Sequence, residues 1–439
     1  MVLNRFLLPL RLQDGSAGWT NTVTISLKEE FMFDNPGLWY VGAAGMIRSI
    51  GFGATWPFMA IFFNRIMHVP IYAVGLIFAL LAICGTIFQI IGGYLSDFRG
   101  RRFTLLLGST IGIAIYAGIV LLLIHGTGIL PLVVLFVLSS ISGSLIFPSF
   151  NALIVDITLP GNRMNAFSLF RILTNSGWAI GPIAGSVLFN YGVVWIFFLV
   201  MLTLIAQFCI IYFLIRDRRA HTRKTTAGIR ARFSDLIVFD RTLLIFSAGT
   251  FLLFVLSSQF SVTLPTYAVV RTSILSNQLG YIFAVNGLVV VFGQYPITTA
   301  VRRLREETVV MLGTAFYMVG FTLVAFSGNL LQLMADMVLI TIGENLTSPG
   351  INSMVSRLSP EDRVGRYMAF NGMANSAGRA TGPTVGSIFL FIFSFNGIEV
   401  WSSLDLFGLF SLIILAYLLI SGKRGSSSNA NGTIPAFHR

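Results

Sequence analysis

FTLLLGSTIGIAIYAGIVLLLIHGTGILPLVVLFVLSSISGSLIFPSFNALIV, residues 103–155, contains no Asp, Glu, Lys or Arg. These 53 residues are more than twice the roughly 20 apolar residues that one bilayer crossing needs. The run lacks the alternation of a β-barrel strand, and in lipid a helix satisfies its own backbone hydrogen bonds. It therefore predicts two transmembrane helices joined by a hairpin. Residues 172–215 form a second charge-free run, which likewise predicts two transmembrane helices joined by a hairpin.

The whole chain is too apolar to be a soluble domain. Of its 439 residues, 55% are hydrophobic and only 10% are charged, which leaves too little polar surface to cover a globule. Cys84 and Cys209 lie inside apolar runs, and the four histidines are scattered, so neither a disulfide framework nor a metal site is predicted. No phosphate-binding GxxxxGK[ST] loop and no nucleophile–base set is found, which argues against an ATP-driven pump and against an enzyme. No cofactor is expected.

The apolar runs predict an all-α integral membrane protein with twelve transmembrane helices in two pseudo-symmetric six-helix bundles. Five domains follow: a cytoplasmic segment at 1–36, a bundle at 37–215, a basic cytoplasmic linker at 216–241, a bundle at 242–421 and a cytoplasmic tail at 422–439 that reads as disordered. The predicted helices are 38–64, 71–96, 103–124, 129–156, 164–189, 194–215, 243–270, 278–301, 308–327, 331–356, 367–394 and 402–421.

The two halves repeat one pattern of Pro, Asn, Arg, Ser and Gly residues at an offset of 200 or 201 positions. Nine matches within about 38 residues indicate an internal duplication, and paired bundles of this kind are the layout of a rocking transporter. The first series is Pro148, Asn151, Pro160, Arg163, Asn175, Ser176, Gly181, Pro182 and Gly185, and the second is Pro349, Asn352, Pro360, Arg363, Asn375, Ser376, Gly382, Pro383 and Gly386.

The basic residues are distributed unevenly between the connections. Of 29 Lys and Arg residues, 24 fall in the termini and in every second connection, and only Arg65 and Arg271 fall in the others. The positive-inside rule then places both termini in the cytoplasm of a multi-pass protein of the cell membrane. The net charge of +12 is thus explained by topology and contact with the lipid bilayer, with no need for a nucleic-acid partner.

The chain resembles the major facilitator superfamily over nearly its whole length. Residues 93–102, GYLSDFRGRR, are similar to the family's signature loop, and residues 177–185, GWAIGPIAG, are similar to its antiporter motif. Arg48, Gln294-x-Pro296 and Gly343-Glu344 resemble the drug/proton antiporter branch. The helix predicted at 129–156 departs from that branch because it has no intramembrane Arg.

The signature loop has two interpretations. One is a charged turn that only orients the chain. The other, which the resemblance implies, is a cytoplasmic gate in which Asp97 meets the amino-terminal end of the helix predicted at 367–394 and Arg101 pairs with Asp156. Small residues would permit the tight turn and the close approach of helices. The predicted gate residues are Gly93, Asp97, Gly100, Arg101, Arg102 and Asp156.

Glu344 is the main candidate for binding a substrate or carrying a proton, because it lies near the middle of the helix predicted at 331–356. A carboxylate at that depth is costly and usually faces a cavity or a partner. The alternative is a fixed ion pair with Arg48 or Arg379. Arg48 lies about 14 Å into its helix from Trp39 and suits either a counter-ion or an anionic substrate. The other candidates are Asp336, Gln259, Asn286 and Gln294.

The two Gly-Pro motifs are predicted to pack and bend helices rather than to bind substrate. Their residues are Gly177, Gly181, Pro182, Gly185, Gly382, Pro383 and Gly386. Together these observations predict a monomeric secondary transporter that works by alternating access and exports small amphipathic compounds in exchange for protons. Two alternatives stay open: an importer of a nutrient or organic anion with the same fold, and a membrane sensor that transports nothing.

Overall fold

The computed structural model describes residues 35–126, 128–159, 163–215, 240–272, 274–360 and 364–430. By its internal contacts the chain divides into a unit at Met1–Pro36 and a unit at Gly37–Arg439. Nearly all of the first unit, most of the predicted basic linker and the end of the predicted tail lie outside the described residues.

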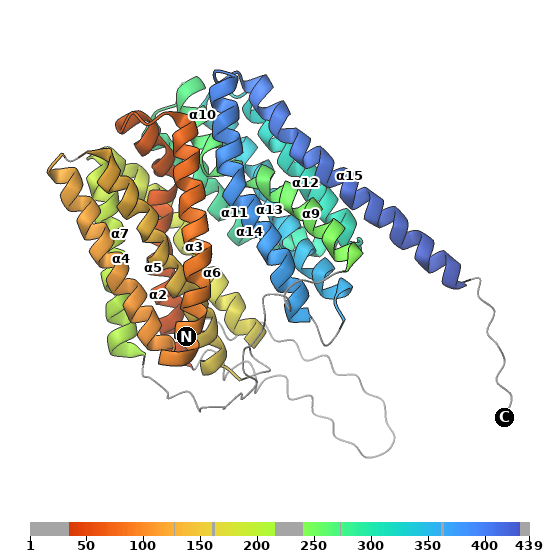
Figure 1. Cartoon of the computed structure of the whole chain (residues 1–439), viewed down its shortest axis with the longest axis horizontal. Coiled ribbons are helices and arrows are strands. Elements are labelled where there is room, and N and C mark those ends of the chain that lie inside the picture. Colours follow the sequence, from red (N-terminus) through yellow and green to blue (C-terminus); the bar gives the residue numbers. More distant parts are fainter. Residues whose placement is uncertain are drawn as a thin grey trace, which may run out of the picture. The chain divides into compact units, whose positions relative to one another are not determined.

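The first six membrane-length helices run from Pro36 to Leu214 (Figure 1). The first of them, α2, continues into a π-helical turn at Phe62–Ile66. Together they form the first bundle. The helices are α2 (Pro36–Ile61), α3 (Ile71–Arg99), α4 (Arg101–Ile124), α5 (Ile129–Ile157), α6 (Arg163–Phe189) and α7 (Val193–Leu214).

The next six run from Arg241 to Ala430 and form the second bundle. They are α9 (Arg241–Ser257) continuing as α10 (Thr263–Arg271), α11 (Leu279–Val301), α12 (Glu306–Val324), α13 (Leu330–Leu358), α14 (Val364–Ile392) and α15 (Gly397–Ala430). The predicted all-α architecture with twelve helices is confirmed in the described residues. Eleven of these segments have the length and apolar composition of a membrane span, and the twelfth, α14, is more polar.

Two helices differ from the prediction. The helix predicted at 243–270 is interrupted after Ser257, because Ser258 and Ser261 bond backbone carbonyls and Pro265 has no N–H to offer the turn before it. The last helix continues to Ala430, where the sequence predicted a disordered tail from residue 422. The tail contains no proline before Pro435, so every residue from Gly422 to Ala430 has the backbone N–H that a helix needs.

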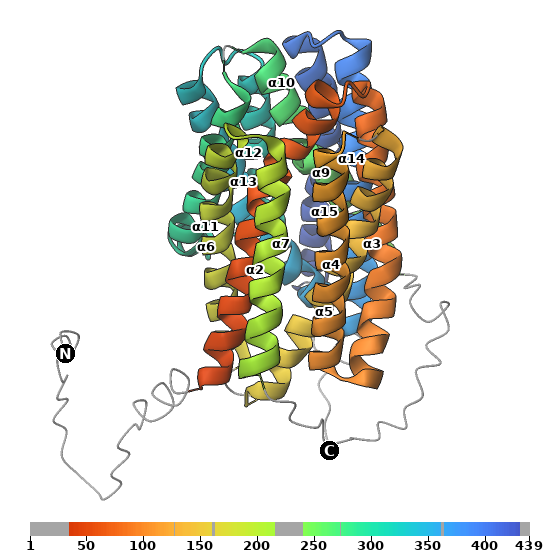
Figure 2. The ribbon, with the colours of Figure 1, turned by 90° about the vertical axis from the view of Figure 1, so that its left-hand side faces the viewer.

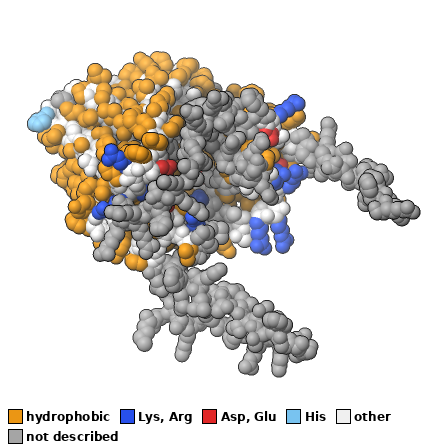
Figure 3. Space-filling model, turned by 60° about the horizontal axis from the view of Figure 1, so that its bottom comes forward, with side chains coloured by type: hydrophobic (Ala, Val, Ile, Leu, Met, Phe, Trp, Pro, Cys, Tyr) orange, Lys and Arg blue, Asp and Glu red, His pale blue; other side chains and the backbone are white. Residues whose placement is uncertain are grey.

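Large apolar side chains are exposed along the outside of the helices. Leu130, Phe213 and Phe292 each expose 70% or more of their surface. In the view of Figure 3, hydrophobic side chains cover much of the described surface and charged ones are few. A surface of this kind is matched to lipid tails.

Glycines of the two Gly-Pro motifs let helices pack closely inside each bundle. A Cβ on Gly181 of α6 would lie 2.6 Å from the carbonyl oxygen of Ile50 in α2, and one on Gly382 of α14 would lie 2.6 Å from the carbonyl oxygen of Val255 in α9. The repeated motif therefore serves the same packing contact in both halves.

The two bundles meet along α3 with α14 and along α6 with α11. We call the end of the helices that carries Gly100 and Arg302–Arg305 the basic end, and the opposite end the far end (Figure 2). Toward the far end both interfaces are tight. A Cβ on Gly75 would meet Thr384 Cα at 2.8 Å, and one on Gly287 would meet Ala179 Cα at 2.5 Å.

Toward the basic end the same interface helices are more exposed. Tyr94 and Phe98 of α3 expose 69% and 71% of their surface, and Tyr295 of α11 exposes 82%. The bundles therefore pack tightly toward the far end. Toward the basic end, side chains of α3 and α11 are more exposed, although Arg171 of α6 still reaches Gln294 of α11 at 3.4 Å.

Candidate functional site

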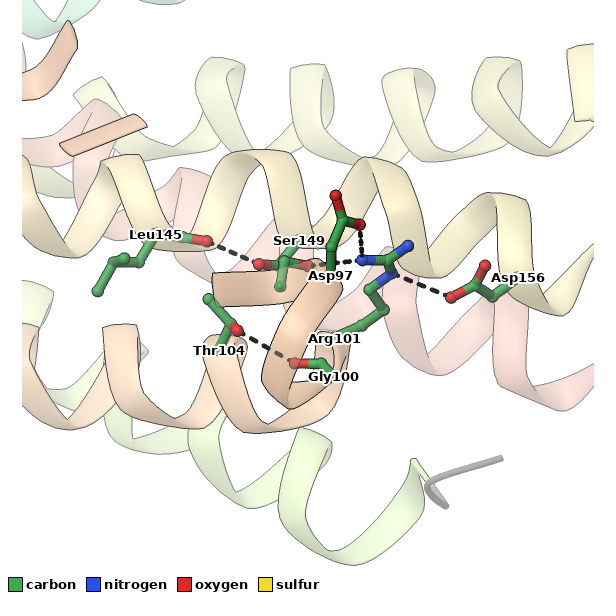
Figure 4. A network of polar contacts seen from close by, with 8 residues as sticks. Asp97, Gly100, Arg101, Thr104, Leu145, Ser149 and Asp156 are labelled. Carbon is green, nitrogen blue, oxygen red and sulfur yellow. Dashed lines mark hydrogen bonds and ion pairs between the residues drawn. The ribbon is translucent and has the colours of Figure 1, made fainter. Parts of the chain in front are cut away.

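Arg101 is the centre of the predicted gate (Figure 4). Its guanidinium group binds Asp97, one turn back along the chain, and its Nε lies 3.1 Å from Oδ2 of Asp156 at the end of α5. Gly100 takes a positive φ of 98°, which lets α4 begin directly after α3 ends. The structure thus brings Asp97, Arg101 and Asp156 together. Arg102 turns elsewhere and donates to the carbonyl oxygen of Tyr212 at 2.6 Å.

The contact implied between Asp97 and the start of α14 is not found among the described residues, which omit residues 361–363. The side chain of Asp97 is 61% exposed. Gly93 also faces open space, with no heavy atom within 4 Å of where its Cβ would be. The close approach that the sequence predicts for Gly93 is therefore not made in this conformation.

A second charge cluster at the basic end was not predicted. Nε of Arg357 lies 3.1 Å from Glu306, and its Nη2 binds Glu307, a carboxylate that is only 3% exposed. The signs are exchanged between the halves: in the first bundle the acid ends the long helix, and in the second the base does. Position 156 of the first half corresponds to position 357 of the second half at the repeat offset of 201. This correspondence would have pointed to a charge cluster around Arg357.

A cavity of about 380 Å³ lies among α2, α3, α4, α5, α7 and α14. Arg48 of α2 lines it, as does Arg379 of α14, which belongs to the other bundle. We call it the two-arginine cavity. Its other walls combine apolar and hydroxyl side chains, including Phe52, Leu81, Thr86, Gln89, Tyr116, Ser139, Ser140, Ser142, Ser144, Phe147, Leu204 and Ser376.

Glu344 does not line this cavity. Its Oε2 accepts a hydrogen bond from the Asn286 amide at 3.0 Å, and that amide also donates to Thr341 Oγ1 at 3.0 Å. No Lys or Arg among the described residues lies within 4.0 Å of its carboxylate, so the fixed ion pair weighed as an alternative is not formed there.

The remaining polar candidates make contacts between or within helices. Gln259 is buried and donates to the Gly382 carbonyl at 3.0 Å, which ties α9 to α14. Gln294 donates to the Asn345 carbonyl at 3.0 Å and accepts from Arg171 at 3.4 Å, a contact from α11 to α6. Asp336 accepts from Ser327 at 2.5 Å near the far end of α13. None of these three lines the two-arginine cavity.

The sequence profile of the Major Facilitator Superfamily matches the chain over residues 41–307 and again over 271–436. The chain belongs to this superfamily. It is a secondary transporter and a multi-pass membrane protein. The resemblance carried by the signature loop is confirmed.

Individual relatives of this facilitator are distant. The uncharacterized transporter YttB of Bacillus subtilis is 25% identical, over 78% of this chain and 85% of its own. The multidrug resistance protein MdtH of Aeromonas hydrophila is 24% identical, over 80% and 86%. Among solved structures, the peptide transporter POT covers 89% of this chain with a TM-score of 0.70 at 15% identity, and the nucleoside transporter NupG covers 87% with a TM-score of 0.70 at 13% identity. These two structures share the fold.

Most of the cavity of this facilitator was missed by sequence reasoning. Arg48 was found because a charge deep in an apolar helix is conspicuous. Arg379 offered the same signal but was considered only as a partner for Glu344. The serines of α5 give no such signal, since single hydroxyl groups are common in transmembrane helices.

Proposed function

We propose that this facilitator exports small amphipathic compounds across the cell membrane in exchange for protons, by alternating access. The supporting observation is that one cavity is lined by both bundles, and that α3 packs tightly on α14 at Gly75 but faces open space five turns away at Gly93. A rocking motion that reversed these two ends would carry the cavity's contents across the bilayer. We take the basic end as cytoplasmic, because its arginines obey the positive-inside rule.

In this proposal the proton is carried by Glu344. Its carboxylate is partly buried in the membrane, is bonded to a neutral amide, and has no cation within 4.0 Å among the described residues. Such a group can exist charged or neutral without breaking a salt bridge. Asp336, the second candidate, is bonded to a hydroxyl group nearer the far end.

Export is favoured over import by the names of two relatives: the multidrug resistance protein MdtH, and a multi-drug resistance efflux pump PmrA homologue of Lactococcus lactis that is 22% identical. Import of a nutrient or organic anion is the second candidate. The two arginines in the cavity favour an anionic substrate in either direction. The two mechanisms differ in the sign of their coupling. Antiport moves substrate against the proton flow, whereas symport moves both together.

The deciding experiment uses proteoliposomes and a panel of radiolabelled organic compounds. With an acidic lumen, antiport accumulates its substrate, and with an acidic exterior, symport does so. This distinction holds whichever way the protein is inserted. We expect accumulation with the acidic lumen. Accumulation only with the acidic exterior supports the importer, and no flux above protein-free liposomes under either gradient contradicts transport of the tested classes.

A further inference from the structure

We propose that the substrate is an amphipathic organic anion whose negative group is bound by Arg48 and Arg379 in the two-arginine cavity. This inference rests on the proposed transport function and adds the class of compound. The lining of the cavity is positively charged. Among its described lining residues there are two arginines and no Asp or Glu.

Neither guanidinium group has a carboxylate within 4.0 Å in the part of the chain that the structure describes. Their observed partners are aromatic: Arg48 lies 5.9 Å from the ring centroid of Phe52, and Arg379 lies 4.5 Å from that of Phe254. A ring supports the face of a guanidinium group and leaves its N–H edge available. Two cations in membrane-spanning helices with open donor edges are costly, and an anionic group in the cavity that both residues line would offset that cost.

The serines of α5 do not compete for the anion. The hydroxyl groups of Ser139, Ser140, Ser142 and Ser144 donate to backbone carbonyls at 2.6, 2.7, 2.8 and 2.7 Å. A hydroxyl group has a single proton, so these four offer only lone pairs to the cavity. They can accept from an O–H or N–H of the substrate but cannot stabilise a negative charge. Gln89 and Tyr116 are neutral donors in the same wall, so the two arginines are the lining residues whose charge can balance that of an anion.

The remaining wall is apolar and defines the other half of the substrate. Phe52, Leu81, Phe147, Val200 and Leu204 contribute to it. A volume of about 380 Å³ lies at the lower end of the usual range for sites that hold small organic molecules. The cavity therefore fits a compound with one anionic group and a compact hydrophobic body. An amphipathic cation is disfavoured, since it would meet two positive charges and no acid.

The test compares three ligands with the same phenylbutyl body and different ends: a carboxylate, a carboxamide and a trimethylammonium group. Equilibrium binding is measured by dialysis on the full protein in nanodiscs, with empty nanodiscs subtracting partition into lipid. The comparison is repeated with a naphthyl body. We expect the carboxylates to bind at least about tenfold more tightly than the amides, and the ammonium compounds to bind least.

Variants connect this preference to the two side chains. Arg48→Gln and Arg379→Gln should each weaken carboxylate binding about tenfold or more, while Arg48→Lys should retain much of it. Arg65→Gln removes the same charge from an exposed position outside the cavity and should change nothing. The thermal stability of every variant is measured in parallel, so that a misfolded protein is not scored as a binding defect.

Three results would overturn the inference: ammonium or amide ligands that bind as well as the carboxylates, carboxylates that do not bind, or carboxylate binding that both glutamine variants leave unchanged. Failure of the proposed function gives a different pattern. If carboxylates bind through the arginines but no pH gradient drives their flux, the substrate class stands and proton coupling fails. If gradients drive amides or ammonium compounds instead, coupling stands and the substrate class fails.

Discussion

Arg48 and Arg379 lie on different bundles, yet both line one cavity. A ligand that bound both would bridge α2 and α14. At the far end α14 also packs against α3 through Gly75. A shift of α14 would therefore disturb the packing that holds the two bundles together there. The position of these two arginines thus connects ligand binding with the motion that transport requires.

Glu344→Gln should abolish proton-driven flux while leaving substrate exchange intact. Glutamine keeps the shape of the side chain and can still accept from Asn286, but it cannot take up or release a proton. Flux under a pH gradient and exchange without one are measured in the same proteoliposomes. Asp336→Asn is the matched control, because it neutralises the other acid of α13. Full proton coupling in the Glu344 variant would place the proton carrier elsewhere.

Asp97→Asn should lower transport severalfold without reducing the amount of folded protein in the membrane. Its ion pair with Arg101 is largely exposed, and exposed pairs contribute about 1 kcal/mol or less to stability. A defect in transport would therefore come from the gate and not from unfolding. Initial rates are compared with those of Asp156→Asn, which removes the other partner of Arg101. Unchanged flux in Asp97→Asn would mean that the signature loop only orients the chain in the membrane and does not act as a gate.

Gly93→Val should stop transport without destabilising the conformation described here. Gly93 lies 18 residues, about five turns, from Gly75 on the same face of α3, and Gly75 is the point at which α3 packs tightly on α14. A valine at position 93 meets open space now but would block α14 if the basic end closed. Gly75→Val should instead destabilise the described conformation, by about 1–3 kcal/mol, because of the crowding there. Thermal unfolding and flux distinguish the two variants, and normal flux in Gly93→Val would show that α3 and α14 do not approach there.

Arg357→Gln should lower the thermal stability more than Arg101→Gln does. Glu307 is nearly fully buried, and removing its main partner leaves a buried charge, which costs up to about 3–5 kcal/mol. The more exposed carboxylates around Arg101 carry little such penalty. Adding Glu307→Gln to Arg357→Gln should recover part of the loss, since the orphaned charge is then gone. Equal melting temperatures for Arg357→Gln and Arg101→Gln would contradict this account of the cluster.

The fold was largely predictable because lipid imposes long apolar helices, which sequence displays directly. The break at Ser258 was not, since it depends on hydroxyl groups competing for backbone carbonyls. The faces of the helices were harder still. A transmembrane helix is apolar toward lipid and toward its neighbours alike, so sequence does not show which serines of α5 face inward. Arg48 could be predicted as a site residue only because a charge deep in a membrane helix is costly and usually faces a cavity or a partner.

Alternating access requires the two ends of the molecule to open in turn. After Cys84 and Cys209 are replaced by serine, one protein receives spin labels at Phe98 and Met373 near the basic end. A second receives them at Tyr72 and Phe391 at the far end, where the two rings now lie 5.2 Å apart. Double electron–electron resonance then measures both distances at high and low pH and with a bound carboxylate. We predict a reciprocal change, in which a shorter basic-end distance accompanies a longer far-end distance. Two distances that stay fixed, or that lengthen together, would contradict alternating access.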